Sequence, residues 1–179
     1  MYVDLDVLRA NAIVAAAGTP LCAVVKADAY GLGAVRVARA LCGIARSFAV
    51  AVPAEAEELV RAGIAEEITV LGRSLSPVKG RNVTYSVSSR DDVDRLSRYF
   101  SPSFAIAVDT GMHRFGADPS DVGDLYAYAC ERGRVRSVYT HLRAPADEEF
   151  AGAQFSGFGS ATAGLPGPPG GFLGAGGGG

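Results

Sequence analysis

The chain has 179 residues, 49% of them hydrophobic and 20% charged, and its 17 Lys+Arg nearly balance its 19 Asp+Glu. This composition is typical of one globular domain, or most of one, and is too apolar for a chain that is disordered throughout. A formal net charge of −2 provides no basic field for a nucleic-acid backbone or an anionic membrane, so we expect neither as a partner.

The cysteine content predicts a cytoplasmic protein. Cys22, Cys42 and Cys130 are an odd number with no paired spacing, which is typical of free thiols in a reducing compartment. Residues 1–6 lack the basic and apolar run of a secretion signal, and no uncharged run before residue 149 is long enough to span a membrane. CxxC is absent and there are only two histidines, so we expect no metal site.

Short apolar, β-branched runs predict six strands separated by helices. Most of these runs are apolar almost throughout, as expected for strands covered on both faces in a parallel sheet. The predicted strands are residues 21–25, 48–52, 68–71, 83–87, 104–108 and 135–139. The predicted helices are residues 6–17 with Asp6 as the cap, 34–42, 53 to before Gly63, a segment after Ser89, and 118–120 to before Gly133.

This alternation predicts an α/β fold of repeated βα units. Six strands fit either an open doubly wound sheet or part of a (β/α)8 barrel, because a full barrel needs about 250 residues. Residues 157–179 contain 11 glycines and three prolines, and no charged residue follows Glu149. We therefore expect a domain of residues 1–156 and a disordered tail of residues 157–179, which is either a flexible linker or out-of-frame or artificial sequence.

Lysine is scarce, since Lys26 and Lys79 are the only two among 17 basic residues and arginine cannot form a Schiff base. Lys26 follows an apolar run, at the carboxyl end of a predicted parallel strand, where ligands bind in α/β folds. Desolvation at such a position favours a neutral, nucleophilic amine. The alternative is a strand-end lysine whose stem covers apolar surface while its amine faces solvent.

Two further polar residues follow predicted strands. Arg114 lies in VDTGMHRFG, where its forked donor suits a carboxylate or phenolate oxygen, and the alternative is an ordinary loop with a surface Arg–Asp pair. His141 ends the sixth strand in YTH, although a lone histidine is more often structural than functional. Because parallel strands open at one rim, we expect Lys26, Arg114 and His141 to converge there.

Three motifs in this order, VVKADAYG, VDTGMHRFG and YTHLRAPADE, resemble the N-terminal domain of bacterial alanine racemases. The opening VDLDVLRAN is similar to that family's start, and the resemblance covers about residues 2–158. It implies pyridoxal 5'-phosphate as cofactor, a small amino acid as substrate and a homodimer. The implied reaction is the interconversion of L- and D-alanine for cell-wall precursor supply.

The resemblance also implies roles for four residues. Lys26 would hold the cofactor covalently and act as one of two bases at the substrate α-carbon, and Tyr30 would lie near the cofactor phosphate. Arg114 would reach the cofactor's phenolic oxygen and the substrate carboxylate. His141 would lie along the pyridine ring. Lys26 and Arg114 are thus the catalytic candidates, and all four are cofactor-binding candidates.

The sequence departs from the family pattern at several positions. Many members have a lysine, often carbamylated, two positions before the aspartate of DTGM, and this chain has Ala107 there. We therefore expect Arg114 to be held by a carboxylate, by a bound anion, or not at all. Leu32 replaces a frequent histidine, and Arg143 and Pro145 lie in a stretch that is one residue longer than usual.

The fold that the resemblance implies is an incomplete (β/α)8 TIM-type barrel with about six of eight βα units. The last two strands, the arginine at the pyridine nitrogen and the C-terminal β domain, with the tyrosine that is the second base, have no counterpart in this sequence. We therefore interpret the chain as a truncated alanine racemase that is poorly active or inactive. The alternatives are a non-catalytic, single-barrel pyridoxal-phosphate-binding protein of cofactor homeostasis and an inactive remnant.

Overall fold

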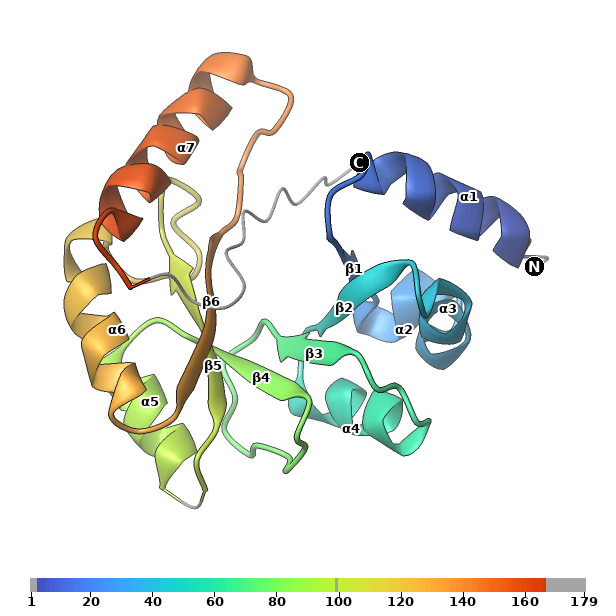
Figure 1. Ribbon diagram of the computed structural model, residues 1–179, viewed down its shortest axis with the longest axis horizontal. Coiled ribbons are helices and arrows are strands. Elements are labelled where there is room, and N and C mark those ends of the chain that lie inside the picture. The colour runs from blue at the N-terminus through green and yellow to red at the C-terminus, as the bar shows by residue number, and fades with distance from the viewer. Residues whose placement is uncertain (1–2, 99, 167–179) are drawn as a thin grey trace. The chain divides into compact units, whose positions relative to one another are not determined.

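The structure, a computed structural model, describes residues 3–98 and 100–166 (Figure 1). The chain divides into two compact units, one on each side of the boundary between Thr84 and Tyr85. Both units are built from strands and helices in alternation, and every strand pair described below is parallel.

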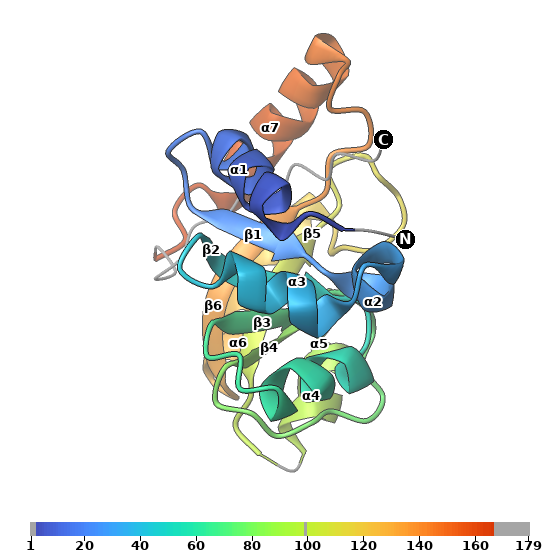
Figure 2. The same cartoon turned by 90° about the vertical axis from the view of Figure 1, so that its right-hand side faces the viewer.

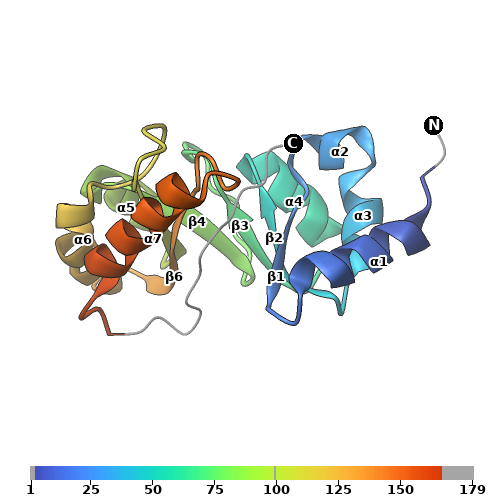
Figure 3. The ribbon, with the colours of Figure 1, turned by 90° about the horizontal axis from the view of Figure 1, so that it is seen from above.

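The first unit starts with a helix and continues through strands that are covered by helices. Its elements are α1 (Leu5–Ala16), β1 (Leu21–Val24), α2 (Lys26–Gly31), α3 (Ala34–Leu41), β2 (Ala45–Val50), α4 (Pro53–Arg61) and β3 (Glu67–Val70). β2 pairs with β1 on one side and with β3 on the other. α2, α3 and α4 lie on one side of these strands (Figure 2), and α1 packs against α3 (Figure 3).

The core of the first unit is centred on β2, because both of its neighbours are strands. Phe48 and Val50 of β2 have no exposed surface, and they lie opposite the equally buried Ile68 and Val70 of β3. Leu59 of α4 is also fully buried, since α4 packs on β2 and β3. A strand that has strands at both edges and helices packed on it is apolar almost throughout. The apolar run in the sequence therefore predicted this strand.

β4 (Val83–Val87) crosses the boundary between the units, and the second unit continues with a further set of βα elements. These are α5 (Arg90–Ser97), β5 (Ser103–Val108), the 3₁₀ turn η1 (Pro119–Asp121), α6 (Val122–Cys130), β6 (Arg134–Thr140) and α7 (Glu148–Thr162). β5 pairs with β6, and its Phe104 and Ile106 are fully buried. α6 packs on both strands and α7 packs on α6.

The predicted strands coincide with the observed ones to within a few residues, and the range 83–87 is identical. The predicted cap of the first helix is wrong, because Asp4 rather than Asp6 takes this role. Asp4 has an extended backbone and its Oδ1 accepts hydrogen bonds from the amides of Asp6 at 3.0 Å and Val7 at 3.1 Å. Ser89 caps α5 as predicted, accepting from the amide of Asp92.

The predicted start of the disordered tail at residue 157 is also wrong, because α7 continues to Thr162. Its glycines each cost about 1 kcal/mol relative to alanine, which hides the helix in a propensity analysis. Ala151, Gln154 and Phe158 nevertheless share one buried face, and Asp147 caps the first turn. Burial of this face outweighs the poor propensity. The remainder of the predicted tail, from residue 167, lies outside the described residues.

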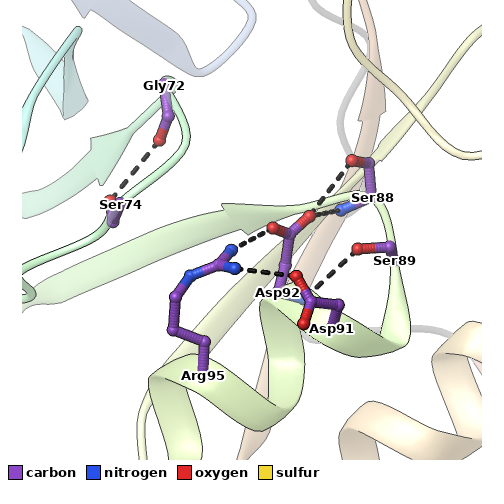
Figure 4. Close-up of polar contacts among 7 residues, drawn as sticks. All are labelled: Gly72, Ser74, Ser88, Ser89, Asp91, Asp92 and Arg95. Atoms are coloured by element: carbon purple, nitrogen blue, oxygen red, sulfur yellow. Dashed lines mark hydrogen bonds and ion pairs between the residues drawn. The ribbon is translucent and has the colours of Figure 1, made fainter.

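Charged side chains gather at the start of α5 (Figure 4). Asp92 is buried, and its Oδ2 accepts hydrogen bonds from the amide and hydroxyl of Ser88 at 3.1 and 3.2 Å. Arg95 pairs with both Asp91 and Asp92. Burial opposes the ionisation of Asp92, but the hydrogen bonds and the guanidinium outweigh it and lower the pKa of this carboxyl. The cluster ties the start of α5 to the residue that follows β4.

Candidate functional site

Lys26 follows β1 with one residue between, and it begins α2. The intervening Val25 is buried, and its amide donates to the carbonyl of Ala49 in β2 at 2.8 Å. Lys26 itself is partly buried, whereas Lys79 is exposed in the segment between β3 and β4. The structure therefore places Lys26, and not Lys79, at the carboxyl end of a parallel strand.

The segment α2 is a left-handed turn. Ala27, Asp28, Ala29 and Tyr30 all have φ between 51° and 57° and ψ between 36° and 48°. In residues with a Cβ this conformation costs roughly 1–2 kcal/mol each. Four such residues in succession persist only where the surrounding structure holds them, and strain of this kind is concentrated at functional sites.

Two carboxylates hold this turn. Glu55 of α4 accepts a hydrogen bond from the amide of Ala27 at 2.7 Å, and its other oxygen accepts from the amides of Ala51 at 2.7 Å and Val52 at 3.2 Å. Asp28 accepts from the amide of Ala34 at 2.7 Å, at the start of α3. The residue after Lys26 is thus tied to the segment that follows β2.

Tyr30, the second candidate of the first unit, ends the left-handed turn. Its side chain is 70% exposed, and the neighbouring Ala29 is buried. Lys26 and Tyr30 therefore belong to one short segment whose backbone is held on both sides. The turn therefore presents Tyr30 to solvent.

Arg114 lies in the loop between β5 and η1, which Asp109 organises. Asp109 Oδ1 accepts hydrogen bonds from the amides of Gly111 at 3.0 Å and His113 at 2.9 Å. Partial burial of Asp109 opposes its ionisation, but these hydrogen bonds and the His113 ring outweigh it and lower the pKa of Asp109. The loop turns tightly at its end, where a Cβ on Gly116 would overlap the backbone of Asp109.

The side chain of Arg114 is exposed, and its guanidinium lies over the ring of Phe115, 5.8 Å from the ring centroid. Within residues 3–98 and 100–166, no carboxylate pairs with it. Ala107, two residues before Asp109, is 6% exposed and offers no polar side-chain atom. Among the described residues, the first of the three outcomes that we expected for Arg114, support by a carboxylate, is therefore not observed.

His141 follows β6 directly and is partly buried. The residues before it join this strand to its surroundings, since Tyr139 and Ser86 share a hydrogen bond of 2.7 Å and Thr140 donates to the carbonyl of Val108 at 2.9 Å. The carbonyl of His141 accepts from Nε2 of Gln154 in α7. The backbone that carries His141 is therefore held by both β5 and α7.

The sequence analysis missed several residues that support these candidates, namely Glu55, Asp109, Thr110, Thr140 and Gln154. Asp109 and Thr110 lie inside the motif VDTGMHRFG, so their position in this motif could have identified them as supporting residues. Gln154 was hidden because the helix that carries it was not predicted, although the spacing of Ala151, Gln154 and Phe158 suits one helix face.

The candidates form two pairs, one in each unit. Lys26 and Tyr30 share the left-handed turn of the first unit. Arg114 and His141 lie after β5 and β6 of the second unit, and both of their segments are bonded to α7. The convergence of Lys26, Arg114 and His141 on one rim stays a prediction.

Solved structures with the same arrangement of elements define the class of fold. The crystal structure of alanine racemase from E. faecalis matches with a TM-score of 0.83 and 26% identity, covering 96% of this chain and 52% of that one. The alanine racemase of D-cycloserine-producing Streptomyces lavendulae matches with a TM-score of 0.82 and 29% identity, covering 96% and 51%. The predicted fold class, α/β with an incomplete (β/α)8 barrel, is confirmed.

Sequence comparison leads to the family. The family model of the alanine racemase N-terminal domain matches residues 3–176. The alanine racemase of Halorhodospira halophila is 35% identical over 182 residues, and that of Xylella fastidiosa strain 9a5c is 39% identical over 158 residues. The chain belongs to the alanine racemase family, whose members are isomerases dependent on pyridoxal phosphate.

The chain spans about half the length of the curated relatives it matches. The alignment with the Halorhodospira halophila protein covers 93% of this chain and 50% of that protein, and the alignment with the Xylella fastidiosa protein covers 82% and 43%. Among the described residues, no helix is both long enough and apolar enough to cross a membrane.

Proposed function

We propose that this chain is the part of an alanine racemase that holds pyridoxal 5'-phosphate, with Lys26 as the point of attachment. The observation that carries the proposal is the position of Lys26 at the carboxyl end of the first strand in a chain whose family model matches residues 3–176. For the whole protein we propose the interconversion of L- and D-alanine.

The residues present fit this cofactor. Lys26 offers a primary amine, which is the group that bonds covalently to the cofactor's aldehyde. Tyr30 and Arg114 are exposed donors suited to phosphate and phenolic oxygens, and Arg114 has no carboxylate partner to give up among the described residues. The left-handed turn that follows Lys26 is held by Glu55 and Asp28, so it limits the positions open to the amine.

When bound, pyridoxal phosphate supplies an electron sink that makes the proton on the α-carbon of an amino acid removable. Lys26 takes or returns this proton at Nζ on one face of the α-carbon. Arg114 binds the substrate carboxylate through its paired N–H groups. His141, whose backbone is fixed by α7 and β5, supports the ring. Racemisation also requires a base on the opposite face, which the family's pattern assigns to a tyrosine of the other half.

We propose Lys26, Tyr30, Arg114 and His141 as the cofactor-binding residues. The support is that each follows the carboxyl end of a strand in a unit of parallel βα elements, where ligands bind in this class of fold. The proposed substrate is a small amino acid and the proposed partner is a second copy of the protein. Three free cysteines support a cytoplasmic location.

Trapping the cofactor on its lysine tests the proposed function. The protein is incubated with pyridoxal phosphate, treated with borohydride and mapped by peptide mass spectrometry. We expect the label on Lys26, its loss in Lys26→Arg, and unchanged labelling in the matched control Lys79→Arg. Label found chiefly on Lys79, or none on the wild-type chain, would refute the proposal.

A further inference from the structure

Gln154 lies in the middle of α7 and is only 1% exposed. Its Oε1 accepts a hydrogen bond from the amide of Arg143 at 2.9 Å. Its Nε2 donates to Thr110 Oγ1 at 3.1 Å and to the carbonyl of His141 at 3.2 Å. One side chain therefore connects α7 with the loop after β5 and with the segment after β6.

The partners of Gln154 determine which way its amide points. A backbone amide only donates and a carbonyl only accepts, so Arg143 requires Oε1 and His141 requires Nε2. Nε2 then donates both of its hydrogens, and Thr110 Oγ1 accepts one of them. A glutamate at this position would keep the acceptor and lose both donors, and a methionine would lose all three hydrogen bonds.

The hydroxyls of Thr110 and Thr140 continue the hydrogen-bond network of Gln154, and the donor and acceptor in each of their bonds can be assigned. Thr140 donates to the carbonyl of Val108 at 2.9 Å, which uses its single hydrogen. The 2.7 Å hydrogen bond between the two hydroxyls is therefore donated by Thr110 and accepted by Thr140. The resulting chain runs from Gln154 through both hydroxyls to the backbone of β5. A buried network in which every member is satisfied makes its surroundings rigid.

α7 also packs directly on the backbone of the loop that carries Arg114. A Cβ placed on Gly111 would lie 3.4 Å from Cζ of Phe150 and 3.8 Å from Cγ of Gln154. Gly111 has a φ of +132°, which side chains rarely tolerate. Asp109 accepts from the amides of Gly111 and His113 in the same loop. The backbone leading to Arg114 is thus held although the Arg114 side chain is exposed.

We infer that Gln154 is a positioning residue, which holds the segments bearing Arg114 and His141 in a fixed relation so that both can contact one cofactor. The inference rests on the proposed function, because it takes Arg114 and His141 as cofactor-binding residues. Gln154 itself touches the backbone of His141 and the side chain of Thr110, and it acts through them. Loss of Gln154 should therefore make the backbone of these two segments more mobile and should lower the affinity for pyridoxal phosphate.

Amide hydrogen exchange of the whole chain, measured without cofactor, tests whether Gln154 holds the two segments. In both Gln154→Glu and Gln154→Met we expect the amides of Gly111 and His113 to exchange about tenfold faster, because the loop loses its bond to α7. The amide of Arg143 should exchange faster in Gln154→Met only, because glutamate keeps its acceptor.

Phe158→Leu is the matched control, since Phe158 is buried on the same helix and makes none of these hydrogen bonds. We expect it to lower the melting temperature while the exchange at Gly111 and His113 changes by less than about twofold. Equal acceleration in all three variants would overturn the inference and leave Gln154 with a general role in stability.

A second pair of variants covers the case in which the Gln154 variants do not fold. Thr110→Val removes the hydroxyl that links Gln154 to Thr140, whereas Thr110→Ser keeps it. We expect faster exchange of Gly111 and His113 in Thr110→Val and rescue of wild-type exchange in Thr110→Ser. Unchanged exchange in Thr110→Val would overturn the inference.

Binding of pyridoxal phosphate, followed by absorbance and by borohydride fixation, tests the link to the cofactor. We expect Gln154→Glu to bind about tenfold more weakly than wild type, with Lys26 still the labelled residue. Wild-type affinity in a folded Gln154→Glu protein would overturn the inference and leave the proposed function intact. Failure of the wild-type chain to bind would overturn the proposed function and the cofactor role of Gln154 with it.

Discussion

Arg114 and Ala107 illustrate how a side chain can be available for a ligand, because no carboxylate among the described residues pairs with the guanidinium of Arg114. Ala107, two residues before Asp109, is buried and offers only a methyl group, so it cannot support the arginine. Arg114 is exposed, with the ring of Phe115 as its neighbour. An exposed arginine without an ion pair contributes little to folding, so its contribution to ligand binding can be measured separately.

We expect Arg114→Ala to leave the free energy of unfolding within about 0.5 kcal/mol of wild type, as for most surface substitutions. Its affinity for pyridoxal phosphate should fall, because the phenolic oxygen loses a charged donor. Denaturant unfolding and cofactor titration check the two expectations. Arg95→Ala is the control, since Arg95 pairs with the buried Asp92 and its loss should lower stability and spare the cofactor. A large loss of stability in Arg114→Ala would contradict the prediction.

The left-handed turn after Lys26 shows how one element can depend on a carboxylate from another. Ala27, Asp28, Ala29 and Tyr30 adopt this conformation without a glycine among them. Glu55 compensates by accepting three backbone hydrogen bonds, one from Ala27 and two from the segment after β2. The turn therefore depends on both α2 and α4, and removal of the Glu55 carboxylate should change the position of Lys26.

Glu55→Ala should lower the free energy of unfolding by roughly 2–3 kcal/mol, because three backbone amides, that of Ala51 partly buried, lose their charged acceptor. Glu55→Gln should cost less, since its remaining oxygen can still accept. Denaturant unfolding measures both, and the rate of borohydride-trapped labelling at Lys26 should fall in parallel. Glu57→Ala is the control, because Glu57 forms an exposed pair with Arg61 on the same helix. Equal losses in the Glu55 and Glu57 variants would contradict the prediction.

The start of α5 should make the protein sensitive to acid. The pKa of Asp92 is lowered in the folded state, so its ionised form stabilises the fold above the unfolded pKa of about 3.9. This contribution is lost as the pH falls through the lowered pKa of the folded state. We expect Asp92→Asn to be less stable than wild type near neutral pH and the difference to shrink below about pH 4. Unfolding curves across this range check it, and a constant difference would refute it.

For the molecule as a whole, we expect these 179 residues by themselves not to racemise alanine at an enzymatic rate. Racemisation removes a proton on one face of the α-carbon and delivers one on the other, and Lys26 serves one face only. The measurement is D-alanine formation from L-alanine with added pyridoxal phosphate, compared with Lys26→Ala. Turnover of roughly 1 per second or faster that disappears in Lys26→Ala would contradict the prediction and require a second base within the chain.

Local patterns in the chain were sufficient for the βα order and for the position of Lys26. Apolar runs and capping residues are local signals, so the strands, the cap at Ser89 and the motifs of the family could be recognised without a fold. The same patterns placed Arg114 and His141 after the fifth and sixth strands, as observed. The agreement is best where a segment's own residues dictate its conformation.

Contacts between distant residues decided the rest. The left-handed turn after Lys26 is held by Glu55, which accepts the amide of Ala27 from 28 residues further along the sequence. The glycine-containing α7 is stable because its apolar face is buried, and Gln154 reaches Thr110 across 44 residues of sequence. No local pattern encodes such contacts, since they arise only when folding brings the groups together and removes them from water. Buried polar groups must then find partners, and that requirement selects the conformations that propensity alone disfavours.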